Sequence, residues 1–482
     1  MRIVESLILS YFCPIFRLFL YLHGCFLFLL VSFAMSDALQ SRFLIAAPTS
    51  GAGKTTVACG LMALLSQRGL KVQPFKCGPD YIDTKYHAQA CRRPSINLDL
   101  FLAGEAHLEQ LFARYEEGAD VCVVEGMMGM YDGYDHDVGS SGDIARRLQL
   151  PVVLVVDARS AAYSIAPLLS GFINFRKEVH VAGVIFNRVG SDAHYRALRE
   201  VCDDLGITCL GRLPRHAALE MGSRYLGLDF SQHMGTDERQ LLVSLLEQHV
   251  DIPLLLKKTS GQRTAKLRTF SENIRTFGSE FLDVSAPHHI VVAANDESFS
   301  FIYQEFVDRL RKVGEPTFLN PEADLPIPAD TDFLYLPGGY PEKHAAALSK
   351  AVRTKASIAE YIERGGRVLA ECGGMIYLST GICFDDATPE HRRFEPMVGV
   401  FPFVVSAKKE HRKLSLGYRR MELDGHELRG HEFHYTQLLP VEGVSLPPSA
   451  CQVYNARGER VATPVFRYKN VVASYTHLYL SE

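Results

Sequence analysis

The stretch FLIAAPTSGAGKTT, residues 43–56, decides the first part of the fold. Its apolar start, Phe43–Ala47, predicts a buried β-strand. Two glycines then permit a tight loop, and an amphipathic helix is expected to begin at Lys54 and Thr55. Loop amides that point inward and a helix N-terminus both favour anions, so the stretch predicts a phosphate cradle. We expect Lys54 to reach the β- and γ-phosphates of ATP and the Thr55 hydroxyl to ligate Mg²⁺.

The loop departs from the pattern G-x-x-x-x-G-K-[ST] at Pro48, which stands where the first glycine is usual. The alternative interpretation is a glycine-rich turn with a solvent-exposed lysine. Asn187, in the run VIFNRV, is expected either to hydrogen-bond a purine ring or simply to end a strand. The predicted ATP-binding residues are Ser50, Gly51, Ala52, Gly53, Lys54, Thr55, Thr56 and Asn187.

The composition is that of an ordinary globular protein, with 47% hydrophobic and 22% charged residues in a chain of 482. This length predicts two or three domains. A net charge of −4 gives no reason to expect nucleic acid as a partner. The 11 cysteines include no C-x-x-C pair, which argues against a zinc site or a redox dithiol and favours free thiols in a reducing cytoplasm.

An apolar segment near the N-terminus conflicts with a cytoplasmic location. Tyr11–Ala34 is long enough to span a bilayer, although Arg17 and His23 interrupt it. A signal peptide or membrane anchor is one interpretation. The other, which we favour, is a start codon placed too far upstream, because Met35 stands just before the first strand and an ATP site requires the cytosol. We therefore expect residues 1–40 to lie outside the fold, and we expect no membrane partner.

Two α/β patterns follow one another along the chain, at 41–250 and 289–482. Runs such as VCVVEG and PVVLVVDA are apolar throughout, which is typical of parallel strands buried on both faces. Each pattern therefore predicts an α/β domain with a mostly parallel sheet flanked by helices. The polar segment between them, 251–288, is interpreted as a linker or covering segment. The predicted strands are 43–47, 71–75, 121–125, 152–157, 181–186 and 208–211, then 290–295, 332–339 and 366–374.

Acidic residues follow the predicted strands of the first pattern. Glu125 ends VCVVEG and Asp132 lies in the next loop, while Asp80, Tyr81 and Asp83 come after the second strand, in KCGPDYIDTKY. Open parallel sheets bind ligands at the carboxyl ends of their strands, where these side chains gather. Each one alone is also consistent with a solvated loop. Together they predict a metal and phosphate site in which Glu125 completes the Mg²⁺ shell.

The second pattern contains a candidate nucleophile. Cys372, in AECGGM, lies at a sharp turn between a predicted strand and a predicted helix. The helix N-terminus is expected to lower the pKa of the thiol, and His477, in VVASYTHLYL, is expected to act as its base. A purely structural thiol is the alternative. The backbone N–H groups predicted to hold an oxyanion are those of Gly338, Gly339 and Gly373.

The run RGHEFHYT suggests a metal cluster at first sight. Its side chains, His431, Glu432 and His434, do not have the H-E-x-x-H spacing of a zinc helix. We interpret them as polar residues on a strand.

A series of short motifs makes the chain resemble a known family. Their order and spacing, from about Arg42 to the C-terminus, resemble those of the cobyrinic acid a,c-diamide synthases of corrin biosynthesis. The first half resembles the dethiobiotin-synthetase group of P-loop proteins, in which the departure at Pro48 is normal. The second half resembles class I glutamine amidotransferases of the cobyric-acid type. The motifs are APTSGAGKTT, KCGPDYID, VVEGMMGMYDG, PVVLVVDA, VIFNRV, LYLPGGYPE, LAECGGMIYL, GHEFHYT and ASYTHLY.

The resemblance implies a ligase of cobalamin biosynthesis that amidates the a and c side-chain carboxylates of cobyrinic acid. L-Glutamine would be the ammonia donor, ATP with Mg²⁺ would activate each carboxylate as an acyl phosphate, and a homodimer is considered as the assembly. The resemblance places Asp80, Tyr81 and Asp132 near the carboxylate and the acyl phosphate. It also implies that Cys372 and His477 release ammonia through a thioester.

One departure concerns the third member of the Cys and His site. Ordinary class I enzymes carry H-x-E, in which the Glu orients the His, but Tyr479 stands at that position here. Glu432 is the candidate replacement, and weak glutaminase activity is expected.

Two alternatives stay open. The same chemistry could act on hydrogenobyrinic acid or on a nickel tetrapyrrole. From a different class, the chain could be a P-loop regulatory ATPase fused to an inactive amidotransferase-like module. That second alternative predicts ATP turnover without any corrinoid and no role for Cys372.

Overall fold

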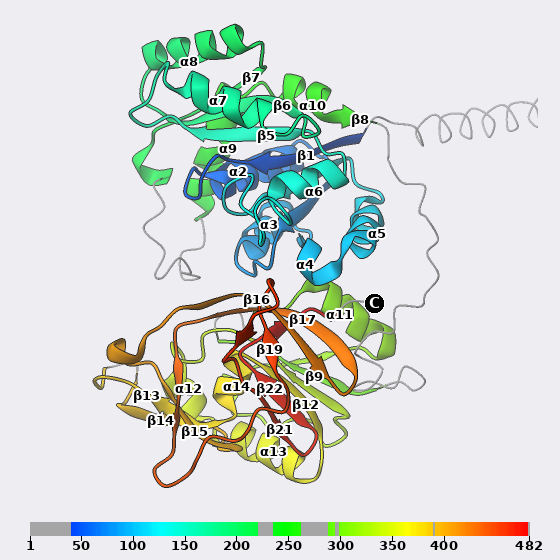
Figure 1. Cartoon of the computed structure of the whole chain (residues 1–482), viewed down its shortest axis with the longest axis vertical. Helices are drawn as coiled ribbons and strands as arrows, with labels where there is room; N and C mark the ends of the chain where they lie inside the picture. Colours follow the sequence, from blue (N-terminus) through cyan, green and yellow to red (C-terminus); the bar gives the residue numbers. More distant parts are fainter. Residues whose placement is uncertain (1–39, 220–234, 262–287, 295–297, 389–390, 481–482) are drawn as a thin grey trace, which may run out of the picture.

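The computed structural model describes residues 40–219, 235–261, 288–294, 298–388 and 391–480. Figure 1 shows two bodies stacked along the long axis, the first in blue to green and the second in yellow-green to red. The apolar stretch Tyr11–Ala34 lies outside the described residues. Within the described ranges, no helix is both long enough and apolar enough to cross a bilayer.

The first domain is a parallel sheet with helices on both faces. Its strands are β1 (Gln40–Ala46), β2 (Val72–Cys77), β3 (Ile96–Leu98), β4 (Val121–Glu125), β5 (Val152–Asp157), β6 (Val181–Val189), β7 (Cys209–Pro214) and β8 (Ser260–Gly261). Its helices are α2 (Lys54–Gln67), α3 (Asp83–Cys91), α4 (Leu100–Ala103), α5 (Glu105–Glu116), α6 (Ser141–Arg147), α7 (Ile165–Asn174), α8 (Asp192–Leu205), α9 (Thr236–His249) and α10 (Ile252–Thr259).

These strands are ordered β3-β2-β4-β1-β5-β6-β7, with every neighbouring pair parallel. One face packs against α5 to α8 and the other against α2, α9 and α10. Phe43, Leu44 and Ile45 are fully buried in β1, near the middle of the sheet. Because β1 is central and leads into α2, the phosphate-cradle loop opens at the middle of the carboxyl edge. The predicted parallel α/β sheet is confirmed.

The segment 251–288 was interpreted from sequence as a linker or covering segment. Its part up to Gly261 folds onto the first sheet. Ile252 and Leu255 of α10 are buried in its core, and β8 pairs antiparallel with β1. The burial of these two apolar side chains outweighs the polar composition of the segment. Residues 262–287 lie outside the described residues. The short edge strand β3 is also absent from the predicted strands.

The second domain has a main sheet ordered β10-β9-β11-β12-β22-β21, in which only the pairing of β21 with β22 is antiparallel. Its strands are β9 (Ile290–Ala293), β10 (Thr317–Leu319), β11 (Phe333–Leu336), β12 (Arg367–Glu371), β21 (Val465–Tyr468) and β22 (Val471–Ser474). Its helices are α11 (Gln304–Val313), α12 (Ala345–Lys350), α13 (Val352–Glu363) and α14 (Gly373–Tyr377). The predicted mostly parallel sheet is confirmed, and the strands end before the glycines that sequence alone included in them.

Smaller sheets cover this main sheet. One is ordered β14-β13-β15-β18 and another β20-β19-β16-β17-β23. Their strands are β13 (Ser379–Cys383), β14 (Phe394–Pro396), β15 (Phe401–Ser406), β16 (Ser415–Leu423), β17 (His426–His434), β18 (Gln437–Pro440), β19 (Val453–Tyr454), β20 (Arg460–Val461) and β23 (His477–Leu478). These sheets were not predicted, but the interpretation of His431, Glu432 and His434 as residues on a strand is confirmed by β17. The second sheet also carries the predicted base, His477.

The two domains meet at the carboxyl ends of β2 and β3. Figure 1 shows α4 of the first domain facing β16 and β17 of the second. Tyr418 Oη donates to Asp99 Oδ2 at 2.7 Å, and Arg429 Nη1 donates to the Phe101 carbonyl oxygen at 3.0 Å. Tyr81 is buried in a hydrophobic cluster made mostly by the second domain. The interface therefore joins the ligand-binding edge of the first sheet to the second domain.

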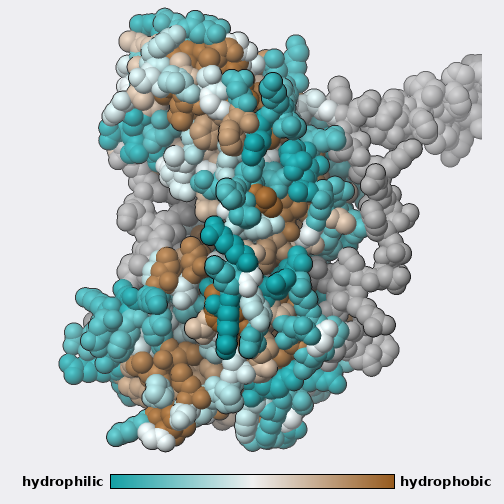
Figure 2. Space-filling view, viewed as in Figure 1, coloured by the Kyte–Doolittle hydropathy of each residue, from teal (hydrophilic) through white to brown (hydrophobic). Residues whose placement is uncertain are grey.

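Apolar side chains also gather on the outside of the first domain. Leu168 of α7 is 40% exposed, and Phe175 just beyond the helix is 56% exposed. Figure 2 shows hydrophobic residues over this part of the surface. The outer face of α7 is therefore an apolar surface on the described chain.

Candidate active sites

The loop before α2 is shaped as the sequence predicts. Gly51 and Gly53 have φ angles of 75° and 96°, a backbone region that favours glycine. A side chain at residue 53 would place its Cβ 2.0 Å from Asn187 Nδ2, so only glycine fits there. The N–H groups of the first turn of α2 have no acceptor within the helix, and they face the loop. This geometry suits an anion such as a phosphate group.

Lys54, the first residue of α2, is almost completely buried at the cradle. Its ammonium donates to the Met128 carbonyl oxygen, in the loop after β4. Burial, with the nearby Lys76 ammonium, lowers the pKa of Lys54 to about 8. The nearby carboxylates do not fully offset the cost of burying the Lys54 ammonium. A further anion in the cradle would therefore be favoured.

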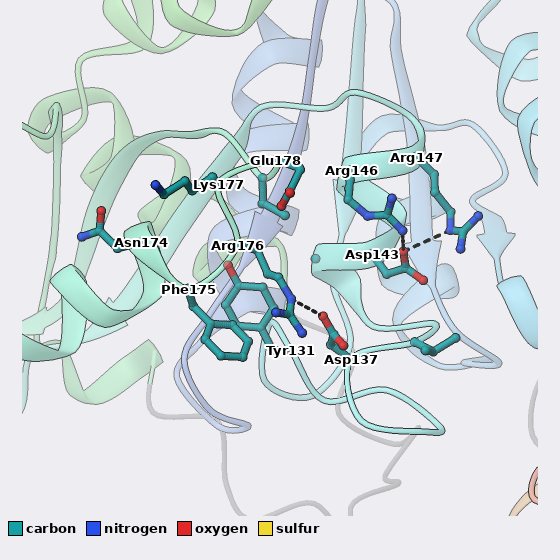
Figure 3. Close-up of a pocket in the computed structure, with 13 residues that line it drawn as sticks. Tyr131, Asp137, Asp143, Arg146, Arg147, Asn174, Phe175, Arg176, Lys177 and Glu178 are labelled. Atoms are coloured by element: carbon teal, nitrogen blue, oxygen red, sulfur yellow. Dashed lines mark hydrogen bonds and ion pairs between the residues drawn. The ribbon is translucent and has the colours of Figure 1, made fainter.

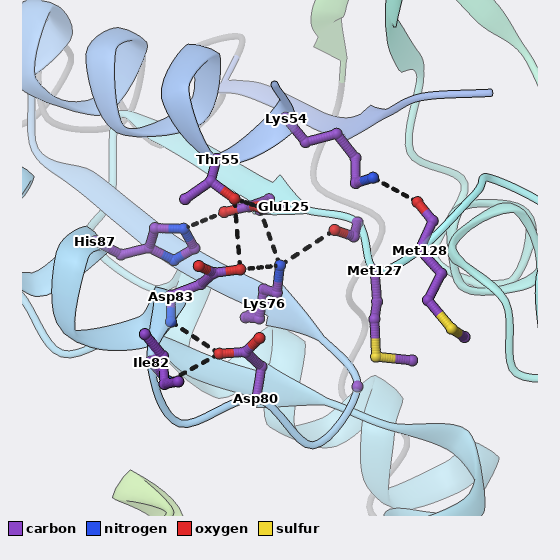
Figure 4. A network of polar contacts seen from close by, with 12 residues as sticks. Lys54, Thr55, Lys76, Asp80, Ile82, Asp83, His87, Glu125, Met127 and Met128 are labelled. Atoms are coloured by element: carbon purple, nitrogen blue, oxygen red, sulfur yellow. Dashed lines mark hydrogen bonds and ion pairs between the residues drawn. The ribbon is translucent and has the colours of Figure 1, made fainter. Parts of the chain in front are cut away.

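Thr55, Asp83 and Glu125 bring oxygen atoms together beside the cradle, as Figure 4 shows. Thr55 Oγ1 donates to Glu125 Oε1 at 2.7 Å. The Lys76 ammonium lies 2.7 Å from Asp83 Oδ2 and 3.0 Å from Glu125 Oε1. The Lys76 ammonium is therefore held between the carboxylates of Asp83 and Glu125.

The charges of this network stabilise one another. Burial alone would raise the pKa of Glu125, but Lys76, His87 and Thr55 outweigh it and hold that pKa well below its usual range. Burial also disfavours the Lys76 ammonium, yet Asp83 and Glu125 outweigh it and raise the pKa of Lys76. Mg²⁺ in proteins is usually held by one or two carboxylates together with phosphate oxygens and water. The oxygen donors of Thr55 and Glu125 fit such an ion.

Two predicted acids hold their own loops in place. Asp80 Oδ1 accepts from the Ile82 and Asp83 backbone N–H groups, both at 2.8 Å, so it orients Asp83 toward Lys76. Burial, with the charge of Asp83, raises the pKa of Asp80 to about 6. Asp132 Oδ2 accepts from the Gly129 N–H at 2.9 Å. Their predicted role near the acyl phosphate stays a prediction.

Asn187 and Tyr81 engage other parts of the protein. The Asn187 amide donates to the Ala52 carbonyl oxygen at 2.8 Å and accepts from the Arg188 N–H at 2.9 Å, so it braces the loop. The Tyr81 ring points into the second domain, with its centroid 5.1 Å from that of Phe301 and 5.2 Å from that of His477. Tyr81 therefore touches the second candidate site and not only the phosphate edge.

Cys372 lies at the predicted turn, directly between β12 and α14. Its φ of 44° is unusual for a residue other than glycine, and such strain is frequent at functional sites. The thiol is buried, and burial together with Glu342 and Glu432 raises its pKa above the usual range. This corrects the predicted direction of the shift, since the short helix α14 does not offset the desolvation. The resting side chain is a neutral thiol.

His477 is 1% exposed, in β23. A Cβ on Gly338 would lie 2.0 Å from the imidazole Cε1, so the ring packs directly on that glycine. A Cβ on Gly373 would lie 2.8 Å from the Gly339 nitrogen. The loop at 338–339 therefore contacts both the imidazole and the turn that carries Cys372, and it brings the predicted oxyanion donors together.

Burial holds His477 in its neutral form and makes the imidazole a weak base in the resting structure. Burial, with the charges of His431 and His434, lowers its pKa to about 3, so the ring is neutral at physiological pH. Its Nδ1 is buried and has no hydrogen-bond partner among the described residues. A neutral imidazole has one nitrogen able to accept a proton.

Comparison with known proteins identifies the family. Residues 43–226 match the model described as "CobQ/CobB/MinD/ParA nucleotide binding domain", and residues 290–482 match "CobB/CobQ-like glutamine amidotransferase domain". A hydrogenobyrinate a,c-diamide synthase of Brucella suis is 39% identical over 447 residues, 90% of this chain and 98% of that protein. The chain belongs to the a,c-diamide synthase family.

Family members named for cobyrinate and for hydrogenobyrinate are both similar to the chain. A cobyrinate a,c-diamide synthase of Caldanaerobacter subterraneus is 39% identical over 453 residues, 91% of this chain and 95% of that protein. Another, of Listeria monocytogenes, is 36% identical over 458 residues, 91% and 96% of the two chains. The solved structure of chloroplast FtsY from Physcomitrella patens aligns with 38% of this chain and 61% of that one at 19% identity, with a TM-score of 0.29 that supports no conclusion.

The third member of the family's Cys and His site is not where H-x-E would place it. Tyr479 donates its hydroxyl proton to Glu305, on α11, so it faces the domain interface. Glu432, the predicted replacement, accepts from Arg419 Nε at 2.5 Å and lies 2.7 Å from His434 Nε2. These contacts occupy both carboxylate oxygens of Glu432, and its predicted role stays a prediction.

Sequence reasoning missed His87 as a site residue and gave Lys76 no role of its own. Lys76 lies near the end of β2, beside Glu125 of β4, a pairing that parallel register produces. His87 is four residues after Asp83 on α3, which places both on one helix face. The helical spacing was therefore the available signal for His87.

A pocket of about 510 Å³ lies beside α6 and the end of α7. Figure 3 shows that its arginines pair with two of its aspartates. Arg176 Nε is 2.7 Å from Asp137 Oδ2, and Arg147 Nε is 3.0 Å from Asp143 Oδ1. None of the predicted site residues lines this pocket, so we do not place the phosphate chemistry in it.

Proposed function

We propose that the chain is a glutamine-dependent carbon–nitrogen ligase that amidates the a and c carboxylates of cobyrinic acid with ATP. Family membership supports the reaction type. The observation that carries the proposal is the contact of Tyr81, from the phosphate-binding domain, with His477 of the other domain, which packs on the loop at 338–339 that also contacts the turn after Cys372. We propose 40–261 as the amidating domain and 288–480 as the glutaminase domain.

The amidating domain makes a ring carboxylate reactive. A free carboxylate is a poor electrophile, and bound Mg·ATP supplies the phosphoryl group that provides a good leaving group. The loop amides and Lys54 bind the phosphates, while Thr55 and Glu125 ligate the metal. Asp80 orients Asp83, which together with Lys76 keeps the site charged.

The glutaminase domain releases ammonia. His477 takes the Cys372 proton as the sulfur attacks the glutamine carboxamide. It then passes that proton to the leaving nitrogen, so that a thioester forms and ammonia is released. The N–H groups of Gly338, Gly339 and Gly373 stabilise the oxyanion. Water then hydrolyses the thioester, and ammonia displaces phosphate from the activated carboxylate across the interface.

The substrate is tested by product mass. The chain is incubated with glutamine, ATP and Mg²⁺ and with cobyrinic acid, hydrogenobyrinic acid or a nickel tetrapyrrole in parallel. We expect a diamide from cobyrinic acid. Hydrogenobyrinic acid is the substrate named for the Brucella relative, which is as similar to the chain as the cobyrinate enzyme of Caldanaerobacter. A faster diamidation of hydrogenobyrinic acid would contradict the choice of cobyrinic acid. ATP hydrolysis with no amide from any ring would favour a regulatory ATPase.

We also propose a second copy of the chain as a partner, in contact with the outer face of α7. Leu168 and Phe175 are exposed there, and a Cβ added at Gly171, between them, would meet no other atom within 4 Å. Exposed apolar patches mark interaction sites, and most soluble oligomers pair the same surface of two copies. Light scattering of the unaltered chain and of Leu168→Asp tests this, and a monomer in both contradicts it.

A further inference from the structure

His87 lies directly behind the candidate metal ligand. It is on α3 with no exposed surface, and its Nε2 is 2.6 Å from Glu125 Oε2. Its other ring nitrogen, Nδ1, is 2.9 Å from Ser95 Oγ. Ser95 is also buried, in the segment before β3. The imidazole is therefore held at both nitrogens, as part of the network in Figure 4.

The two oxygens of Glu125 have different partners. Oε2 is bonded to His87, whereas Oε1 faces Thr55 at 2.7 Å and Lys76 at 3.0 Å. The terminal torsion of a Glu side chain is broad, so a carboxylate bonded through one oxygen alone turns easily. The bond to His87 removes that freedom and keeps Oε1 directed at the Thr55 hydroxyl.

The two partners fix the orientation of the ring. An ionised carboxylate only accepts hydrogen bonds, so Nε2 donates to Glu125. Ser95 Oγ holds the other ring nitrogen, and outer partners of metal ligands often orient a ring in this way.

We propose that His87, oriented by Ser95, is a positioning residue that holds Glu125 for metal binding. The proposal rests on the proposed function, in which Glu125 ligates Mg²⁺. His87 is fully buried behind Glu125, and it acts through that side chain and not on the substrate.

The test compares variants that keep or lose the bond to Glu125. His87→Gln places an amide N–H near the position of Nε2, and His87→Asn places it near Nδ1. Binding of Mn²⁺ is measured by electron paramagnetic resonance in the presence of a non-hydrolysable ATP analogue. We expect His87→Asn to weaken Mn²⁺ binding by about 10- to 100-fold, the usual effect of losing such an outer partner. His87→Gln should restore most of it, and Ser95→Ala should weaken it less than His87→Asn.

The control is another buried histidine that bonds a carboxylate. His107 bonds Glu305 at the domain interface, away from Glu125, so His107→Asn should leave Mn²⁺ binding unchanged. The Mg²⁺ concentration at half-maximal ammonia-dependent amidation should follow the order of the Mn²⁺ affinities. The rate of glutamine hydrolysis should not follow the order of the Mn²⁺ affinities.

Several outcomes overturn the proposal. Equal Mn²⁺ binding by His87→Asn and the unaltered chain does so, as does an equal loss in the Gln and Asn variants. If His87→Asn does not fold, Ser95→Ala decides, and unchanged binding in that variant refutes the role of the pair. The variant Glu125→Gln distinguishes a failure of the positioning role of His87 from a failure of the proposed function. Undiminished Mn²⁺ binding by that variant shows that the metal site itself is misassigned.

Discussion

Lys76 in the first domain and Cys372 in the second are both buried ionisable groups, yet their surroundings act on them differently. Asp83 and Glu125 surround the Lys76 ammonium, so the pKa of Lys76 is raised and its charge is kept. Around Cys372, burial and two carboxylates act in the same direction, so the pKa of the thiol is raised and its charge is suppressed. One site is charged at rest, and the other is neutral.

The difference leaves the two sites in different electrostatic states. The Lys76 ammonium is already paired with Asp83 and Glu125 before any ligand binds. The thiol of Cys372 and the imidazole of His477 are both uncharged.

The largest effect is expected when the thiol of Cys372 is removed, which tests whether the two proposed sites act separately. Cys372→Ala should reduce glutamine-dependent amidation by at least about 10³-fold, because a covalent nucleophile has no substitute. Ammonia-dependent amidation should remain. Amide formation is measured with each nitrogen source, and Cys451→Ala is the control with an intact site. Loss of both activities in Cys372→Ala would contradict two separate sites.

A complementary substitution, of Lys54, disables the proposed phosphate site of the first domain. Lys54→Ala should lower amidation by about 10²- to 10³-fold with either nitrogen source, as expected when a donor to developing negative charge is lost. Lys71→Ala, at an exposed residue before β2, serves as the control. Full activity of Lys54→Ala with ammonia would show that activation happens elsewhere.

The contact between the sites is tested at Tyr81. Its ring packs on Phe301 and beside His477, so Tyr81→Ala should uncouple glutamine hydrolysis from amide formation. The ratio of glutamine hydrolysed to amide formed should rise by about 5- to 150-fold, the usual range for coupled sites. Tyr81→Phe keeps the ring and should keep the ratio. An unchanged ratio in Tyr81→Ala means that the contact is only structural.

The smallest effect is a pH dependence of stability. The pKa of His477 is about 3 in the folded chain and about 6.5 when exposed, so unfolding takes up a proton between these values. Stability is present above about pH 6.5 and is lost as the pH falls toward 3. Relative to His477→Gln, the unaltered chain should lose about 1.4 kcal/mol per pH unit in that window. Urea unfolding of both at pH 7 to 4 measures the slope, and parallel curves would contradict the neutral imidazole.

Local patterns predicted much of the fold. Apolar runs mark the central strands because such runs are stable only when buried on both faces. The turn at Cys372 was predicted because its neighbours, Gly373 and Gly374, permit a sharp change of direction. The burial of α10 was missed, because Ile252 and Leu255 are too few to outweigh a polar composition in a pattern search.

The site was predicted only in part, for a physical reason. Residues at strand ends were found because parallel register brings them to one edge. The direction in which Tyr81 points depends on Phe301, which is more than 200 positions away along the chain. The raised pKa of Cys372 likewise depends on Glu342 and Glu432, which only the folded chain brings near.

By itself, the sequence determined the parallel α/β sheets, the glycine loop before Lys54 and the turn that carries Cys372. All of these follow from local steric and hydrophobic preferences of neighbouring residues. Only the tertiary structure decided that Tyr81 reaches His477, that His87 and Ser95 hold Glu125, and that the thiol is neutral. Those properties depend on burial and on charges from distant segments, and such terms take effect when the chain is packed and water is excluded.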